Sequence, residues 1–84
     1  MPKDSKNPVT EIKVAFLNDS VRCRFQVIKL VADETGIMLF LWTQIPTSPF
    51  EVIKRYITIQ EAMAGWIEEI SDRMGDGFMI MAEG

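Results

Sequence analysis

The sequence predicts an α+β domain in which an antiparallel β-meander of three to five strands packs against one main C-terminal α-helix, at about residues 59–74. Two patterns point to this class. Apolar and polar residues alternate along 11–17 and again along 21–27, which is the period of a half-buried strand. From 59 to 74 the apolar residues recur at spacings of three and four, which is the period of an amphipathic helix.

The first two strands are predicted to form a hairpin. Asn18 and Asp19 lie between them and both tolerate turn conformations, so we place a tight turn there. This turn pairs Phe16 with Val21 and turns one apolar set toward the core. That set comprises Ile12, Val14, Phe16, Val21, Cys23, Phe25 and Val27. Cys23 is accordingly predicted to be a small, buried core residue.

The third predicted strand, residues 37–45, follows a turn at 33–36. No polar residue interrupts it from Ile37 to Trp42, so we expect both of its faces to be covered. The preceding strand changes its alternation near Val27 and Ile28. This change indicates either a β-bulge there or a strand whose far half is covered on both sides.

Residues 50–57 allow two interpretations. They contain strand-forming residues, which favours a strand or a short helix followed by a break. Alternatively, one helix runs through 49–74, but it would be about 39 Å long in a domain roughly 30 Å across. Thr58 and Glu61 have the spacing of a capping box, which marks a helix start in either case. Residues 78–81 can add a short last strand.

Length and composition limit the organisation of the chain. Its 84 residues suit a single domain at 10–84, preceded by a polar, flexible N-terminal tail at 1–9. The longest apolar run is far shorter than the roughly 20 residues that span a bilayer, so we expect no membrane association. A single cysteine favours a reducing cytoplasm. A small acidic chain of this kind also suits an accessory protein of a phage or mobile element.

The residues do not provide a self-contained active site, and we predict that the protein is not an enzyme. The chain has no histidine, which removes the commonest general base and metal ligand. No glycine-rich loop precedes a helix, so no phosphate cradle is expected. Neighbouring acids occur only as 33–34 and 68–69, without the spacing of a metal-binding loop. No cofactor or metal is therefore expected.

Our leading hypothesis is a small non-enzymatic protein-interaction module, such as an adaptor, inhibitor or assembly subunit. The third strand has more apolar surface than one sheet and one helix are expected to cover, so we expect a homodimer formed through the sheet. Methionine adapts to partner surfaces, and two methionines lie near the last residue. The interface candidates are Met38, Phe40, Trp42, Phe78, Met79 and Met81.

The alternative hypothesis is a nucleic-acid or phosphate-binding module. The predicted hairpin register places Lys13 opposite Arg24, with Arg22 beside them. Like charges opposed across a strand pair repel, and a bound anion would relieve that repulsion. The net charge of −3 and the lack of interleaved aromatic residues argue against this alternative.

Overall fold

The computed structural model describes residues 9–44 and 49–84. The predicted tail, residues 1–9, lies outside these ranges except for Val9, which is exposed. Ile45, the last residue of the predicted third strand, also lies outside them.

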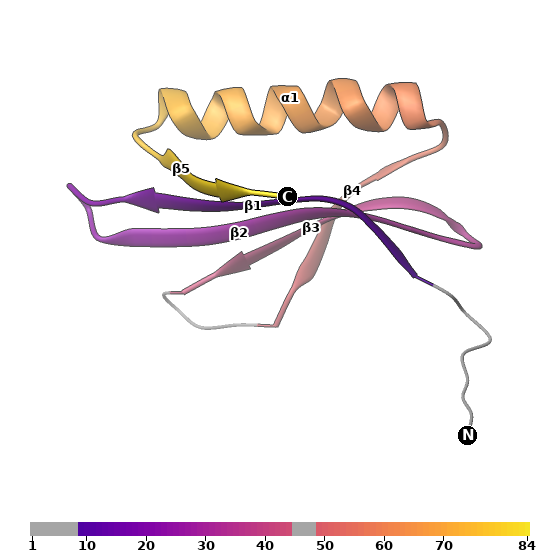
Figure 1. The fold of residues 1–84 in the computed structure, drawn as a ribbon, viewed down its shortest axis with the longest axis horizontal. Coiled ribbons are helices and arrows are strands. Elements are labelled where there is room, and N and C mark those ends of the chain that lie inside the picture. The colour runs from indigo at the N-terminus through magenta and orange to yellow at the C-terminus, as the bar shows by residue number, and fades with distance from the viewer. Residues whose placement is uncertain (1–8, 45–48) are drawn as a thin grey trace.

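The described residues form five strands and one helix in an α+β fold (Figure 1). The elements are β1 (Thr10–Asp19), β2 (Arg24–Asp33), β3 (Gly36–Thr43), β4 (Glu51–Tyr56), α1 (Ile59–Gly75) and β5 (Met79–Glu83). The strands form one antiparallel sheet in the order β4-β3-β2-β1-β5, so β5 returns to pair with β1 at the edge. The predicted fold class is confirmed.

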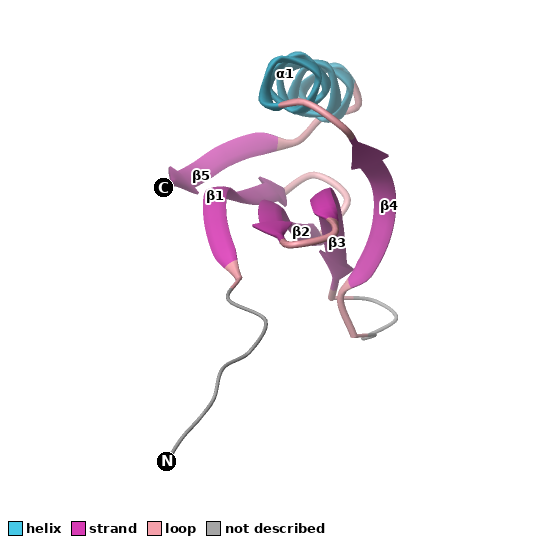
Figure 2. Cartoon of the chain, turned by 90° about the vertical axis from the view of Figure 1, so that its right-hand side faces the viewer, coloured by secondary structure: helices cyan, strands magenta, loops and turns pink. Residues whose placement is uncertain are grey.

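The core lies between α1 and the face of the sheet beneath it (Figure 2). The side chains at its centre are Ala15, Leu17, Ile28, Leu30, Leu39, Ala62, Trp66, Ile70 and Phe78. The principal extents of the molecule are 45 × 30 × 19 Å. Figure 1 looks down the shortest of these axes and shows α1 above the sheet, so the helix and sheet layers stack across that axis and not along it.

The register of the first hairpin differs from the prediction. Phe16 pairs with Val27 rather than Val21, six residues further along β2. The loop is Ser20–Cys23 rather than Asn18–Asp19, because the Asp19 carboxylate accepts hydrogen bonds from the backbone N–H groups of the loop at 3.1 and 3.2 Å. This side chain holds a longer loop closed and lets both strands extend to ten residues.

The face of β1 that packs against the helix was also predicted incorrectly. Ala15 and Leu17 are fully buried in the core, whereas Phe16 between them is 38% exposed on the opposite face. Both sets of alternating residues in β1 are apolar, so hydrophobicity alone does not distinguish them. The register of β1 with β2 shifts between Glu11 and Lys13, and that of β1 with β5 shifts between Phe16 and Leu17. No shift occurs near Val27 in either ladder of β2.

Cys23 is exposed at the end of the hairpin loop and not buried as predicted. Its φ of 57° is left-handed, a conformation that residues with a Cβ adopt at a cost. The longer loop takes Cys23 out of the strand, so the alternation of buried and exposed residues along a strand does not apply to it.

The ambiguous segment at 50–57 contains a strand, β4, followed by a break; the continuous helix is wrong. α1 starts at the predicted capping box: the Thr58 hydroxyl accepts from the Glu61 N–H at 3.1 Å, and the Glu61 carboxylate accepts from the Thr58 N–H at 3.4 Å. Of the predicted inner face, Trp66 and Ile70 are buried, while the end residues Ile59 and Met74 are about half exposed.

Candidate functional site

The face of the sheet opposite α1 is apolar, and no element of the described chain packs against it (Figure 2). Its largest side chains come from β1, β2, β3 and β4 and from the residue that precedes β4. They are Phe16, Phe25, Phe40, Trp42, Phe50 and Val52. We call this set the open face.

Four of the five aromatic side chains of the open face pack edge to face in pairs. Phe25 and Trp42 have ring centroids 6.1 Å apart at an interplanar angle of 76°. Phe40 and Phe50 are 6.5 Å apart at 83°. The Lys29 ammonium lies 4.4 Å from the centroid of the Phe50 ring and 3.8 Å from the carboxylate of Glu11. The one lysine within this apolar surface is thus balanced by an acid and an aromatic ring.

The predicted interface residues fall into three environments. Phe40 and Trp42 lie half-buried on the open face, and Met38, on the same face, is only 8% exposed. Met79 and Met81 lie on the edge strand β5 and are 66% and 63% exposed, and the pairing of Met79 with Asn18 puts Met79 at the rim of the open face. Phe78 belongs to the core, where it is 4% exposed beneath the Arg24 guanidinium.

Sequence reasoning missed Phe16, Phe25, Phe50 and Val52 as members of the open face. Phe16 and Phe25 were assigned to the core because the helix was expected on their side of the hairpin. Phe50 and Val52 could not be placed while the segment 50–57 had two interpretations. All four alternate along the chain with residues that face the helix. This alternation assigns them to the opposite face only when the register of the strands is known.

A groove of about 320 Å³ runs between α1 and the β1–β5 edge of the sheet. Its lining is mainly apolar and comes from one flank of the helix: Met63, Trp66, Ile67 and Ile70. Lys13, Ser71 and Glu83 complete it. Lys13 is therefore a groove residue and does not lie beside Arg22 and Arg24.

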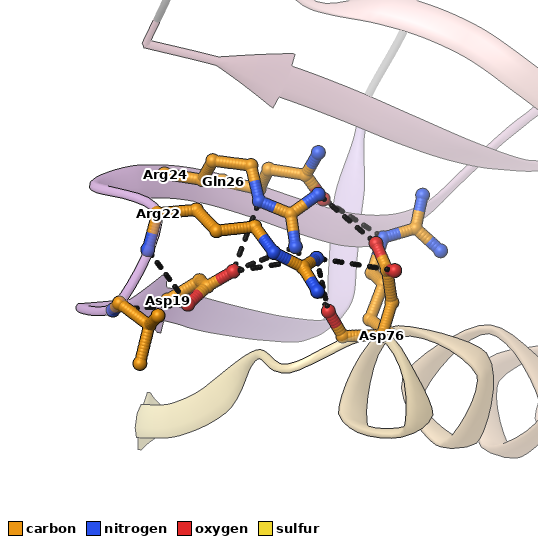
Figure 3. A network of polar contacts seen from close by, with 7 residues as sticks. Asp19, Arg22, Arg24, Gln26 and Asp76 are labelled. Carbon is orange, nitrogen blue, oxygen red and sulfur yellow. Dashed lines mark hydrogen bonds and ion pairs between the residues drawn. The ribbon is translucent and has the colours of Figure 1, made fainter.

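Arg22 and Arg24 contact acids at the end of the hairpin (Figure 3). The Arg24 guanidinium donates to Asp19 at 2.6 Å and to the Asp76 carboxylate at 3.0 Å. Arg22 donates to the Asp76 backbone carbonyl at 2.9 Å. Because Arg24 pairs with Asp19 in the sheet and Lys13 pairs with Leu30, the like-charge opposition that motivated an anion site is wrong.

This network joins the first hairpin to the C-terminal end of α1, since Asp76 is the helix C-cap. Asp19 is only 2% exposed, and the hydrogen bond from Arg24 holds the pKa of its carboxyl below the ordinary value. The same guanidinium lowers the pKa of Asp76. The groups thus stabilise one another in their charged forms.

We expect this network to make stability depend on acidity. A carboxyl whose pKa is lowered by folding stabilises the native state above its unfolded pKa, near 3.9, and loses that effect as the pH falls through the folded value. The free energy of unfolding should therefore decrease below about pH 4. Urea denaturation at a series of pH values checks this.

Asp19→Asn should have a lower free energy of unfolding near neutral pH. Below about pH 4 its free energy of unfolding should fall less steeply than that of the wild type. Hydrogen bonds from Thr35 also lower the pKa of Asp33. Asp33→Asn therefore measures how much this carboxylate contributes to the loss of stability in acid. If Asp19→Asn lost stability below about pH 4 as steeply as the wild type does, the network around Asp19 would not be the cause of the acid dependence.

The described residues hold no group of three or more cysteine, aspartate or glutamate side chains that could bind a metal ion. In residues 9–44 and 49–84, no helix has both the length and the apolarity needed to cross a membrane. No family model, curated protein or solved structure matched the chain.

Proposed function

We propose that the protein is a non-enzymatic interaction module that forms a homodimer through the open face of its sheet. The observation that supports this proposal is the uncovered apolar face, to which four strands contribute. Contiguous apolar surfaces of this kind mark interaction sites in soluble proteins. Aromatic residues with pre-packed rings are also the side chains that contribute most to binding energy.

A second copy fits this face better than a highly charged partner. Lys29 and Glu11 on the face are paired, so two copies of the acidic chain meet there with little charge repulsion. A two-fold axis places the same patch on both subunits. Two sheets packed through their open faces form a sandwich with one helix on each outer side, which buries both faces of each sheet.

The remaining chemistry agrees with a binding role. The chain has no histidine, and the guanidinium groups of Arg22 and Arg24 hold Asp19 and Asp76. A phosphate bound there would have to displace these carboxylates, so nothing favours the nucleic-acid alternative. We place the protein in the cytoplasm, because an exposed Cys23 stays reduced there.

Sedimentation equilibrium tests the dimer. The wild type should be dimeric at micromolar concentrations, whereas Phe16→Lys and Val52→Lys should shift it to a monomer. Both side chains are 38% exposed, so these variants should keep the native circular dichroism. Ile57→Lys is the matched control, because Ile57 is 88% exposed in the turn before α1 and should leave the dimer intact.

Tryptophan quenching gives a second measurement. Trp66 is 2% exposed, so acrylamide reports mainly on Trp42. Dilution of the wild type through the dissociation range should increase quenching. A wild type that stays monomeric at about 1 mM would overturn the proposal.

A further inference from the structure

We propose a second binding site, at which an extended apolar segment of a partner protein pairs with the outer edge of β5 as a sixth strand. Its alternate side chains enter the groove beneath α1. This inference rests on the proposed interaction function and names a partner class, but it uses a surface distinct from the open face.

The two edges of the sheet differ in protection. β4 carries Glu51, Lys54 and Arg55, the kind of charged edge that discourages strand addition. β5 is Met79–Glu83, has no lysine, arginine or proline, and is exposed along its whole length. An apolar, unprotected edge is the one to which another strand adds.

The hydrogen bonds of β5 show which groups are directed outward. Gly84 and Val14 exchange both backbone hydrogen bonds, at 2.8 and 3.2 Å. In an antiparallel ladder the adjacent residue directs its N–H and C=O away from that partner. The backbone groups of Glu83, which lies opposite Ala15, therefore point away from β1 and are placed to bond an incoming strand.

The two flanks of α1 also differ in protection, since one carries paired charges and the other exposes apolar side chains. One flank is closed by ion pairs, with Glu69 bonded to Arg73 at 2.6 Å and 3.6 Å from the ammonium of Lys54. The other flank lines the groove, where Ile67 is 64% exposed; Met74, two turns further along, is 52% exposed. A sixth strand beside β5 would cover this apolar flank.

The groove defines the occupant. A dry apolar cavity of about 150 Å³ holds a benzene ring, so 320 Å³ admits two side chains of about that size. The charges that line it, Lys13 and Glu83, balance each other, which suits an uncharged segment. A second copy pairing through its own β5 would bring a second Glu83 carboxylate to the groove, at a desolvation cost.

The test uses fluorescein-labelled heptapeptides in which threonine alternates with valine, leucine, methionine or phenylalanine. Fluorescence anisotropy should show saturable binding of at least one peptide at or below about 1 mM. Hydrogen exchange measured by NMR should show new protection of the Glu83 amide. A peptide with proline at its centre should bind more weakly, because it lacks one ladder donor.

Two variants locate the site. Glu83→Pro removes an outward N–H but no bond to β1, and Glu83→Gln controls for the lost charge. Ile67→Lys places a charge in the groove, and Val21→Lys is its control, since Val21 is 89% exposed at the hairpin loop. Glu83→Pro and Ile67→Lys should each weaken binding by about tenfold or more, while the controls bind as the wild type does.

The inference would be overturned if none of the peptides bound at about 1 mM. It would also be overturned if both variants bound the peptides as the wild type does. A change of oligomeric state in Glu83→Pro would also overturn it, because the occupant would then be a second copy. The Val52→Lys variant separates the two proposals. It should lose the dimer and still bind peptide, so failure of the dimer does not mimic failure of this site.

Discussion

Replacing Trp66 with alanine should lower the free energy of unfolding by about 3–5 kcal/mol. Trp66 is 2% exposed at the centre of the core, where the indole packs between α1 and the sheet. Truncation removes a large apolar contact and leaves a cavity that the surrounding strands cannot fill. A domain of 84 residues has a stability of about 4–13 kcal/mol, so we expect this loss to unfold a measurable part of the population.

Urea denaturation followed by far-ultraviolet circular dichroism measures this loss. The Val52→Lys background removes any contribution of dimer dissociation to the apparent stability. Trp42→Ala is the matched control, because Trp42 is only half-buried on the open face. It should cost less than half as much as Trp66→Ala; equal losses would contradict the placement of the core on the helix side alone.

Gly65→Ala should destabilise the protein by about 2 kcal/mol, although alanine is the better helix former. Gly65 is buried where α1 crosses the ring of Tyr56. An alanine Cβ would lie 2.5 Å from Cζ and 2.6 Å from Cε1 of that ring, and closer still to its hydroxyl oxygen. Either the helix or the ring has to move.

A double-mutant cycle identifies the cause. Tyr56→Ala removes the ring, so Gly65→Ala should cost little in that background. Tyr56→Phe keeps the clashing ring carbons and should not rescue it. Gly75→Ala is the control within the same helix, because its added Cβ meets nothing within 4 Å beyond the neighbouring backbone of the helix itself. It should be neutral or stabilising, and a loss equal to that of Gly65→Ala would refute the steric explanation.

Local signals predicted the helix well. The capping box at Thr58 and Glu61 and the spacing around Trp66 and Ile70 depend on residues within one or two turns of each other. The start of the helix and its buried side are therefore encoded nearby in the chain. The size of the domain favoured a break before Thr58 but left the continuous helix open, and the structure decides for the break.

The hairpin shows what local signals miss. Asn18 and Asp19 resemble a tight turn, but the Asp19 side chain closes a four-residue loop and pairs with Arg24 across it. The shift of six residues is even, so Phe16, Phe25 and Val27 still share a face. Ile12 does not, because the register shift between Glu11 and Lys13 brings it to the core on the helix side. Which face meets the helix depended on distant packing, and the prediction chose the wrong one.

The candidate site was predicted in part. Phe40 and Trp42 lie on the open face, because an apolar strand without polar alternation carries large side chains on both sides. The interaction of Arg24 with Asp76 joins residues that are 52 positions apart, and no pattern in the sequence around either residue predicts it. The groove likewise arises only when β5 returns beside β1.

The exposed position of Cys23 supplies a ready attachment point for a reporter. It is the only thiol in the chain, and the hairpin loop that carries it forms one end of the long axis (Figure 1). A maleimide dye would attach there without any engineered cysteine. Energy transfer between two dyes in a dimer would then distinguish sheets stacked with aligned strands from sheets crossed at a right angle.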